Sequence, residues 1–142
     1  MKISAKTEYA CIAMLELAAR YGSGEPVRIR TIAEEHGVPA RFLVQILLQL
    51  KGAGLVASTR GASGGYQLIK PPDEISLGEV MNVIEGADEP ISTSASADSR
   101  SAMVLQSAWQ EVADTERQAL QAITFADLVE RARQTSENMY YI

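Results

Sequence analysis

An arginine lies at the centre of a glycine-rich segment with short apolar flanks. Residues 55–69 read Leu-Val-Ala-Ser-Thr-Arg-Gly-Ala-Ser-Gly-Gly-Tyr-Gln-Leu-Ile. This pattern predicts two antiparallel strands, at about 55–58 and 66–69, joined by a tight loop. Glycines let a loop backbone approach a DNA duplex closely, and an arginine gains from the negative potential of a narrow minor groove. The residues we expect at such a contact are Thr59, Arg60, Gly61, Ser63, Gly64 and Gly65.

A second set of side chains with DNA-reading chemistry lies upstream, on a predicted helix. Four apolar residues at helical spacing are expected to face the core: Leu43, Ile46, Leu47 and Leu50. The opposite, outward face then carries Ala40, Arg41, Val44 and Gln45. Arginine can read guanine or grip a phosphate, glutamine can read adenine, and valine can contact a thymine methyl group. We therefore predict a recognition helix whose N-terminal side chains enter the major groove.

The residues before and at the start of this helix predict the elements that position these side chains. Ser4 is expected to cap a first helix, whose apolar stripe contains Ala10, Met14, Leu17 and Tyr21. A short second helix buries Ile29, Ile32 and Ala33, and Gly37 ends it as a left-handed cap. Pro39 suits the first turn of the third helix. Helix, turn, helix and hairpin together predict a winged helix, a mainly α fold with one small β-hairpin.

The C-terminal half predicts a second function, self-association. Ser76 with Glu79 resembles the cap of a fourth helix, and Thr124 with Asp127 resembles the cap of a last short helix through Leu128, Val129 and Ala132. The polar residues 87–100 are expected to form a flexible loop between the winged domain at 1–86 and a unit at 101–142. A long helix at about 101–122 carries an apolar stripe outside the winged-helix core. A second copy of the chain is its simplest partner, which predicts a homodimer. The expected dimerisation residues are Leu105, Ala108, Trp109, Val112, Ala119 and Ile123.

The net charge of −5 hides an asymmetry that favours a nucleic-acid partner. Residues 1–70 carry nine Lys and Arg against five Glu, or +4, whereas residues 71–142 carry four Arg against thirteen Asp and Glu, or −9. The basic half can follow phosphates, and the acidic half should point away from them. Four side chains of the basic half are expected to hold phosphates and set the register: Lys6, Tyr9, Arg28 and Arg30.

Several functional classes are disfavoured by composition. There is no run of about 18 apolar residues to span a membrane and no apolar segment after Lys2 and Lys6 to act as a secretory signal, so we expect a cytoplasmic protein. Cys11 is the only cysteine and His36 the only histidine, which predicts a packed thiol, a surface imidazole and no metal site. No serine has a nearby base to activate it, so we expect no enzymatic activity.

Six short segments carry a resemblance to a known family. They are Lys-Thr-Glu-Tyr-Ala at 6–10, Ile-Ala-Glu at 32–34, Leu-Val-Gln-Ile-Leu at 43–47, Gly-Leu-Val at 54–56, Arg-Gly-Ala-Ser-Gly-Gly-Tyr at 60–66 and Ile-Ser-Leu-Gly-Glu-Val at 75–80. Through them the run from Met1 to about Gly86 resembles the IscR/NsrR/CymR family of winged-helix transcription regulators. The resemblance implies a homodimer with a long C-terminal dimerisation helix, partly palindromic operators, a wing arginine at Arg60 and a base-reading surface at Arg41, Val44 and Gln45.

The chain departs from that family at one point. Many members hold an iron–sulfur cluster through three cysteines before the dimer helix, and counting back from Trp109 places these positions near Met103 and within 91–97, where no thiol occurs. Because such clusters need several thiolates, we predict a cluster-free protein without a cofactor. The expected function is a sequence-specific, homodimeric repressor that binds double-stranded DNA and answers either a small-molecule effector or a protein partner. The alternative is a winged helix used for protein–protein contact.

Overall fold

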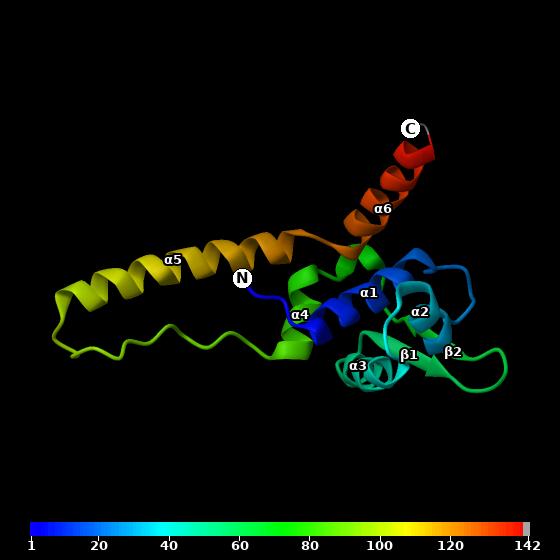
Figure 1. The fold of residues 1–142 in the computed structure, drawn as a ribbon, viewed down its shortest axis with the longest axis horizontal. Helices are drawn as coiled ribbons and strands as arrows, with labels where there is room; N and C mark the ends of the chain where they lie inside the picture. The colour runs from blue at the N-terminus through cyan, green and yellow to red at the C-terminus, as the bar shows by residue number, and fades with distance from the viewer. Residues whose placement is uncertain (141–142) are drawn as a thin grey trace.

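The computed structural model describes residues 1–140 and confirms the predicted winged helix (Figure 1). Its elements follow in the order α1 (Ala5–Ala19), α2 (Ile29–His36), α3 (Ala40–Gly52), β1 (Val56–Thr59), β2 (Gly65–Leu68), the 3-10 turn η1 (Pro72–Glu74), α4 (Leu77–Glu85), α5 (Arg100–Ala122) and α6 (Phe125–Tyr140). The strands β1 and β2 form one antiparallel hairpin. No helix among the described residues is long and apolar enough to cross a bilayer.

Local capping explains where the helices begin and end. The Ser4 hydroxyl accepts a hydrogen bond from the Thr7 amide at 3.2 Å, and Gly37 ends α2 with φ of 64°, a left-handed conformation that glycine adopts without strain. Pro39 is the N-cap of α3 rather than part of its first turn. The prediction for Tyr21 is wrong, because α1 ends at Ala19 and the Tyr21 side chain is 45% exposed.

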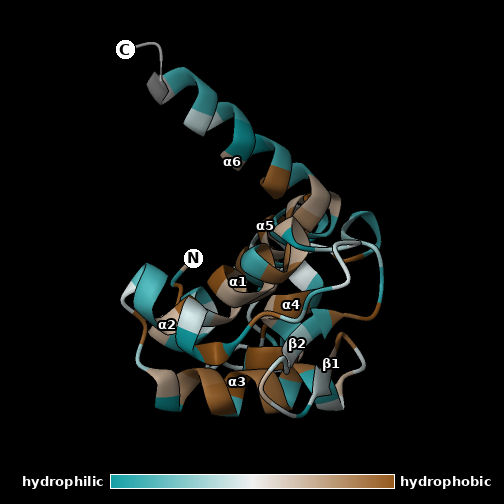
Figure 2. Cartoon of the chain, turned by 90° about the vertical axis from the view of Figure 1, so that its right-hand side faces the viewer, coloured by the Kyte–Doolittle hydropathy of each residue, from teal (hydrophilic) through white to brown (hydrophobic). Residues whose placement is uncertain are grey.

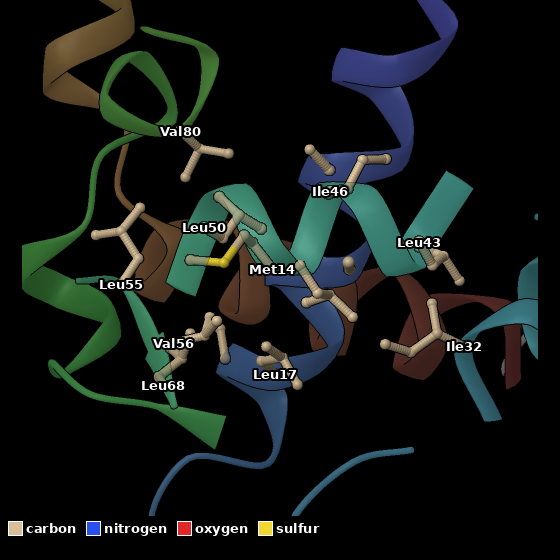
Figure 3. Close-up of a cluster of buried hydrophobic side chains, with 14 of the residues drawn as sticks. Met14, Leu17, Ile32, Leu43, Ile46, Leu50, Leu55, Val56, Leu68 and Val80 are labelled. Carbon is tan, nitrogen blue, oxygen red and sulfur yellow. The ribbon is translucent and has the colours of Figure 1, made fainter. Parts of the chain in front are cut away.

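The core of the winged helix forms between α1, α3 and the hairpin. Figure 3 shows Met14 and Leu17 from α1 facing Ile46 and Leu50 from α3, with Val56 and Leu68 closing one side and Ile32 another. All four residues of the predicted buried stripe of α3 are fully buried: Leu43, Ile46, Leu47 and Leu50. Their burial fixes the rotation of α3 about its axis, so the face that carries the polar side chains is directed outward.

The beginning of α6 is part of this core, which the sequence did not predict. Phe125 is fully buried, and its amide donates to the Ile75 carbonyl at 3.0 Å. On the other side of the same contact, the Leu77 amide donates to the Ile123 carbonyl at 2.8 Å. These backbone contacts, with the Ser76–Thr124 bridge between them, attach the root of α6 to the segment that enters α4.

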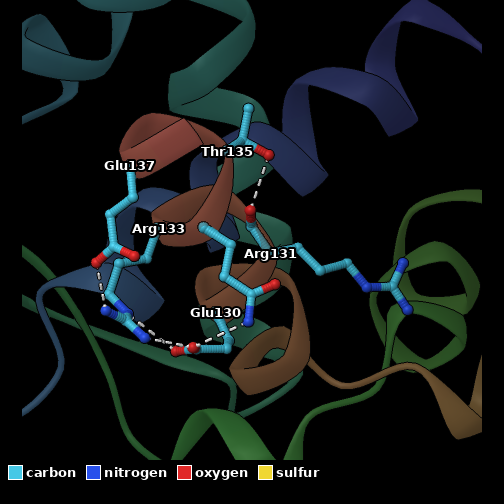
Figure 4. Close-up of polar contacts among 6 residues, drawn as sticks. Glu130, Arg131, Arg133, Thr135 and Glu137 are labelled. Atoms are coloured by element: carbon cyan, nitrogen blue, oxygen red, sulfur yellow. Dashed lines mark hydrogen bonds and ion pairs between the residues drawn. The ribbon is translucent and has the colours of Figure 1, made fainter. Parts of the chain in front are cut away.

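The outer part of α6 leaves the core and is hydrophilic along most of its length (Figure 2). The Thr124–Asp127 cap predicted for its start is confirmed, because the Asp127 amide donates to the Thr124 hydroxyl at 3.1 Å and the Asp127 carboxylate accepts from the Thr124 amide at 3.0 Å. Farther along, Arg133 pairs with Glu130 and Glu137 at helical spacing (Figure 4). Such pairs support an exposed helix, which explains why α6 continues beyond the short helix expected.

The long helix α5 projects from the winged domain as an arm (Figure 1). The Ser99 hydroxyl accepts from the Ala102 amide at 3.2 Å and caps its start. The connecting segment 87–99 has no regular secondary structure and runs out beside α5, where the Gln106 amide group donates to the Ile91 carbonyl. The arm therefore has one long face that none of the described residues covers.

Candidate nucleic-acid interface

The outward face of α3 carries the side chains predicted to read bases. Ala40, Arg41, Val44 and Gln45 are all exposed, as their placement opposite the buried stripe requires. Sequence analysis missed Phe42, which is also exposed on this helix. Its ring lies 5.1 Å from the Arg41 guanidinium carbon and 6.1 Å from the Tyr9 ring. This stacking restricts where the guanidinium can lie, and its N–H groups donate to no side chain or carbonyl within the part of the chain that the structure describes.

The hairpin forms the wing. Val56 pairs with Leu68 and Thr59 with Gly65, so both strands begin and end one residue away from the predicted bounds. The loop between them, 60–64, turns through a hydrogen bond from the Gly64 amide to the Gly61 carbonyl at 3.0 Å. Arg60 directly follows β1 and is exposed at this turn. An arginine at the end of a two-stranded ribbon has the reach that a groove contact needs.

Two wing glycines are required by packing inside the hairpin. A Cβ on Gly64, which is buried, would lie 2.2 Å from the Thr59 carbonyl oxygen. A Cβ on Gly65 would lie 2.5 Å from the Val27 carbonyl oxygen, beside the bridge in which Val27 and Tyr66 exchange both backbone hydrogen bonds. The glycine signal at 64 and 65 therefore reports the shape of the wing, and the DNA contact predicted for these residues has no separate support.

The wing and α3 are joined by side chains as well as by the core. The Lys51 ammonium, in the last turn of α3, donates to the Ser58 hydroxyl of β1 at 2.7 Å. Figures 1 and 2 place α3 and the hairpin together at one end of the molecule and the C-terminal part of α6 at the other. The helices α5 and α6, which carry six of the thirteen acidic residues of the acidic half, thus extend away from the face that carries Arg41 and Arg60 (Figure 1).

The four predicted phosphate-binding residues differ in their surroundings. Arg28 is exposed at the N-cap of α2, a helix end that itself favours anions. Arg30 is exposed but pairs with Glu34 at 2.9 Å, so a phosphate must compete with that carboxylate. Lys6 and Tyr9 are half-buried on α1, and Tyr9 contacts the Phe42 ring. Of these four, Arg28 is the one that is exposed and forms no ion pair within residues 1–140.

The predicted dimerisation residues lie mainly on the uncovered arm. Val112 is 65% and Trp109 56% exposed, and Leu105 is 49% exposed. Met103 and Val104, which the sequence reading did not include, are also exposed near the start of α5. Ile123 differs, because it follows α5, is half-buried and holds the Leu77 amide through its carbonyl.

Comparisons with known proteins agree with this geometry. The Rrf2 family model, described as iron-dependent transcriptional regulator, matches residues 3–131. CymR, an HTH-type transcriptional regulator of Bacillus subtilis, is 34% identical over 143 residues that span all of both chains. The solved structure of CymR, described as the global cysteine regulator of B. subtilis, superposes with a TM-score of 0.82 at 33% identity and covers 92% of this chain and 98% of that one. The solved structure of IscR of T. potens superposes with a TM-score of 0.78 at 33% identity and covers 95% of this chain and 90% of that one.

The iron dependence in the family description can be tested against the residues of this chain. The segment before α5 contains no cysteine, and the single thiol, Cys11, is half-buried on α1. Removal from water, with a smaller effect of the Glu85 charge, raises the pKa of Cys11 to about 11. The thiol is therefore protonated at neutral pH, whereas cluster iron binds several thiolates. These residues do not fit a thiolate-held iron–sulfur cluster.

Proposed function

The chain belongs to the Rrf2 family of helix-turn-helix transcription regulators, and we propose that it acts as a homodimeric repressor that occupies operator DNA without an iron–sulfur cluster. In this proposal α3 enters the major groove and presents Arg41, Val44 and Gln45 to base edges. The wing carries Arg60 into the neighbouring minor groove. Arg28, Arg30, Lys6 and Tyr9 lie along the flanking phosphates.

The observation that carries the proposal is the fixed relation of α3 to the wing. A buried stripe sets the rotation of α3, and the Lys51–Ser58 hydrogen bond of 2.7 Å joins its end to β1. Two base-reading elements on one rigid support can fit a duplex with little rearrangement, which lowers the entropic cost of binding. A winged helix that served only protein–protein contact would not need two exposed arginines at these two places.

The dimer is proposed from the apolar surface of α5. Leu105, Trp109 and Val112 lie along the arm and are each about half exposed or more. Full burial of an exposed side chain of this size contributes about 1.5–3 kcal/mol, and a matching pair of rows from two copies would gain a share of that at each partly exposed residue. A two-fold dimer would present two α3 helices to half-sites one DNA turn apart, or a multiple of one turn. Repression then follows from occupancy of the operator.

Selection of bound fragments from genomic DNA tests the proposal directly. We expect a partly palindromic consensus, retention of the complex at physiological salt and sedimentation of the free protein as a dimer. Recovery of no preferred sequence, even at low ionic strength, would contradict the DNA-binding role and favour the protein–protein module. The signal that releases the operator, whether a small molecule or a protein partner, can be sought afterwards by its effect on this complex.

A further inference from the structure

Three side chains that can bind a metal come together where α1 passes the end of α2. Within the part of the chain that the structure describes, Glu16, Glu35 and His36 place one possible ligand atom each within 4.8 Å of the others. The His36 Nε2 atom lies 2.8 Å from the Glu16 carboxylate oxygen. Because residues 16 and 36 are far apart in sequence, the cluster was invisible to a search for local motifs, and His36 was expected to be an isolated surface group.

We propose that Glu16, Glu35 and His36 form a site for one divalent first-row transition-metal ion. One imidazole and two carboxylates are a donor set that suits zinc and ferrous iron, with solvent completing the coordination. Around a metal with bonds of about 2.1 Å, neighbouring ligand atoms lie about 3.0–3.4 Å apart. The spacing of 2.8 Å between His36 and Glu16 is close to that value, and a Glu35 carboxylate oxygen lies within 4.8 Å of both ligand atoms.

The electrostatic surroundings favour a cation at this point. His36 is the last residue of α2, and the carbonyl groups that end a helix carry partial negative charge. The Glu16 side chain is only 19% exposed, so its charge is less screened than that of a free surface carboxylate. Glu35 is exposed and can rotate toward an ion without disturbing the core.

The position of the site suggests what the metal does. Glu16 lies on α1, the helix at the centre of the core, whereas Glu35 and His36 end α2, directly before the turn into α3. An ion held by all three would fix that turn relative to α1. Metal binding would then stabilise the folded chain and set the position of α3. This regulatory consequence depends on the proposed DNA-binding function, but the metal site itself does not.

The full-length protein, free of any histidine tag and treated with a chelator, can be titrated with Co²⁺. We expect one Co²⁺ per chain, a visible d–d spectrum without the thiolate charge-transfer band, displacement by Zn²⁺ and no displacement by Mg²⁺. His36→Gln and Glu16→Gln should each lower the Co²⁺ affinity by about 10- to 100-fold or more, since even losses outside the ligand set have effects of that size. Zn²⁺ should raise the melting temperature of the wild type but not that of His36→Gln or Glu16→Gln.

Glu34→Gln is the matched control, because Glu34 lies on α2 next to the cluster but pairs with Arg30. It should bind Co²⁺ as the wild type does. Equal Co²⁺ binding by the wild type and His36→Gln would overturn the site, as would no binding at all. Operator binding measured in EDTA separates the two proposals. A protein that binds DNA but no metal overturns this inference alone, and one that binds metal but no DNA overturns the proposed function alone.

Discussion

The Thr7 hydroxyl donates a hydrogen bond of 2.6 Å to the Glu85 carboxylate and so joins the first turn of α1 to the last residue of α4. Thr7 is fully buried, and Glu85 is its acceptor across 78 positions of sequence. The Ser4 hydroxyl adds a second hydrogen bond to the same carboxylate at 2.9 Å. Together they hold the pKa of Glu85 below its ordinary value, because each bond favours the charged form.

This relationship predicts a dependence of stability on pH. Since the folded pKa of Glu85 is lowered, its contribution is complete above the ordinary glutamate pKa of about 4.3 and is lost as the pH falls through the folded value. Urea unfolding between pH 6 and pH 3 should show a steeper loss of stability for the wild type than for Glu85→Gln. Glu89→Gln, in the exposed connecting segment, is the control and should follow the wild type.

Replacement of the wing arginine tests the groove contact. Arg60→Ala should weaken operator binding and lower the slope of log affinity against log salt concentration by about one unit, since one cationic contact is removed. Fluorescence anisotropy across a salt series measures both effects. Arg117→Ala removes an arginine from α5, where it pairs with Asp114 at 3.0 Å, and should leave both quantities unchanged. If Arg60→Ala and Arg117→Ala had the same operator affinity and the same salt dependence, Arg60 would not contact the DNA.

A charge on the uncovered arm tests the dimer. Val112→Asp should shift the protein from dimer to monomer in sedimentation velocity, because a carboxylate would be buried without a partner. Gln118→Asp adds the same charge to an exposed polar position of α5 and should leave the dimer intact. If Val112→Asp remained a dimer with unchanged affinity, the interface would have to lie elsewhere.

The docking of α6 has a measurable contribution to stability. Phe125→Ala should lower the free energy of unfolding by about 3–5 kcal/mol, the usual effect of removing a fully buried aromatic ring. Equilibrium urea denaturation gives this quantity. Leu128→Ala, one turn farther along and only partly buried, should have a smaller effect. A negligible effect of Phe125→Ala would mean that α6 is detached in solution.

The thiol chemistry of the chain can be tested without reference to DNA. With a pKa of about 11, Cys11 has a thiolate fraction of about one part in a thousand at pH 8. Alkylation by iodoacetamide should therefore be slow in the folded protein and fast in urea. Anaerobic incubation with iron and sulfide should leave the protein colourless, and a stable brown species would contradict the cluster-free assignment.

Local periodicity and capping signals were sufficient to predict most of the winged helix. The buried stripe of α3, the left-handed Gly37 and the caps at Ser4, Ser76 and Thr124 all depend on residues close in sequence, and the structure confirms them. Tyr21 was misplaced because a helical stripe does not itself report where the helix ends. The C-cap at Arg20 and the turn at Gly22 decide that boundary.

Features that depend on distant pairs were missed. Phe125 directly follows the residue expected to cap a short last helix, and its place in the core depends on contacts with residues distant in sequence, such as Ile75. Phe42 was missed because helical periodicity separates a buried face from an exposed one but does not predict contacts between side chains. The stacking of the Phe42 ring against the Arg41 guanidinium is such a contact. The DNA contacts themselves stay predictions, since the positions of side chains in the free protein do not show which bases they meet.

The anchored base of α5 has a geometric consequence for the operator. Its 23 residues make a rod about 35 Å long, and the hydrogen bonds at Ile75, Leu77 and Ile123 leave its root little freedom to swivel. In a two-fold assembly such a rod would fix the distance between the two DNA-binding domains. Operators with one base pair inserted between the half-sites should therefore bind more weakly, because the duplex would have to twist to match that fixed distance.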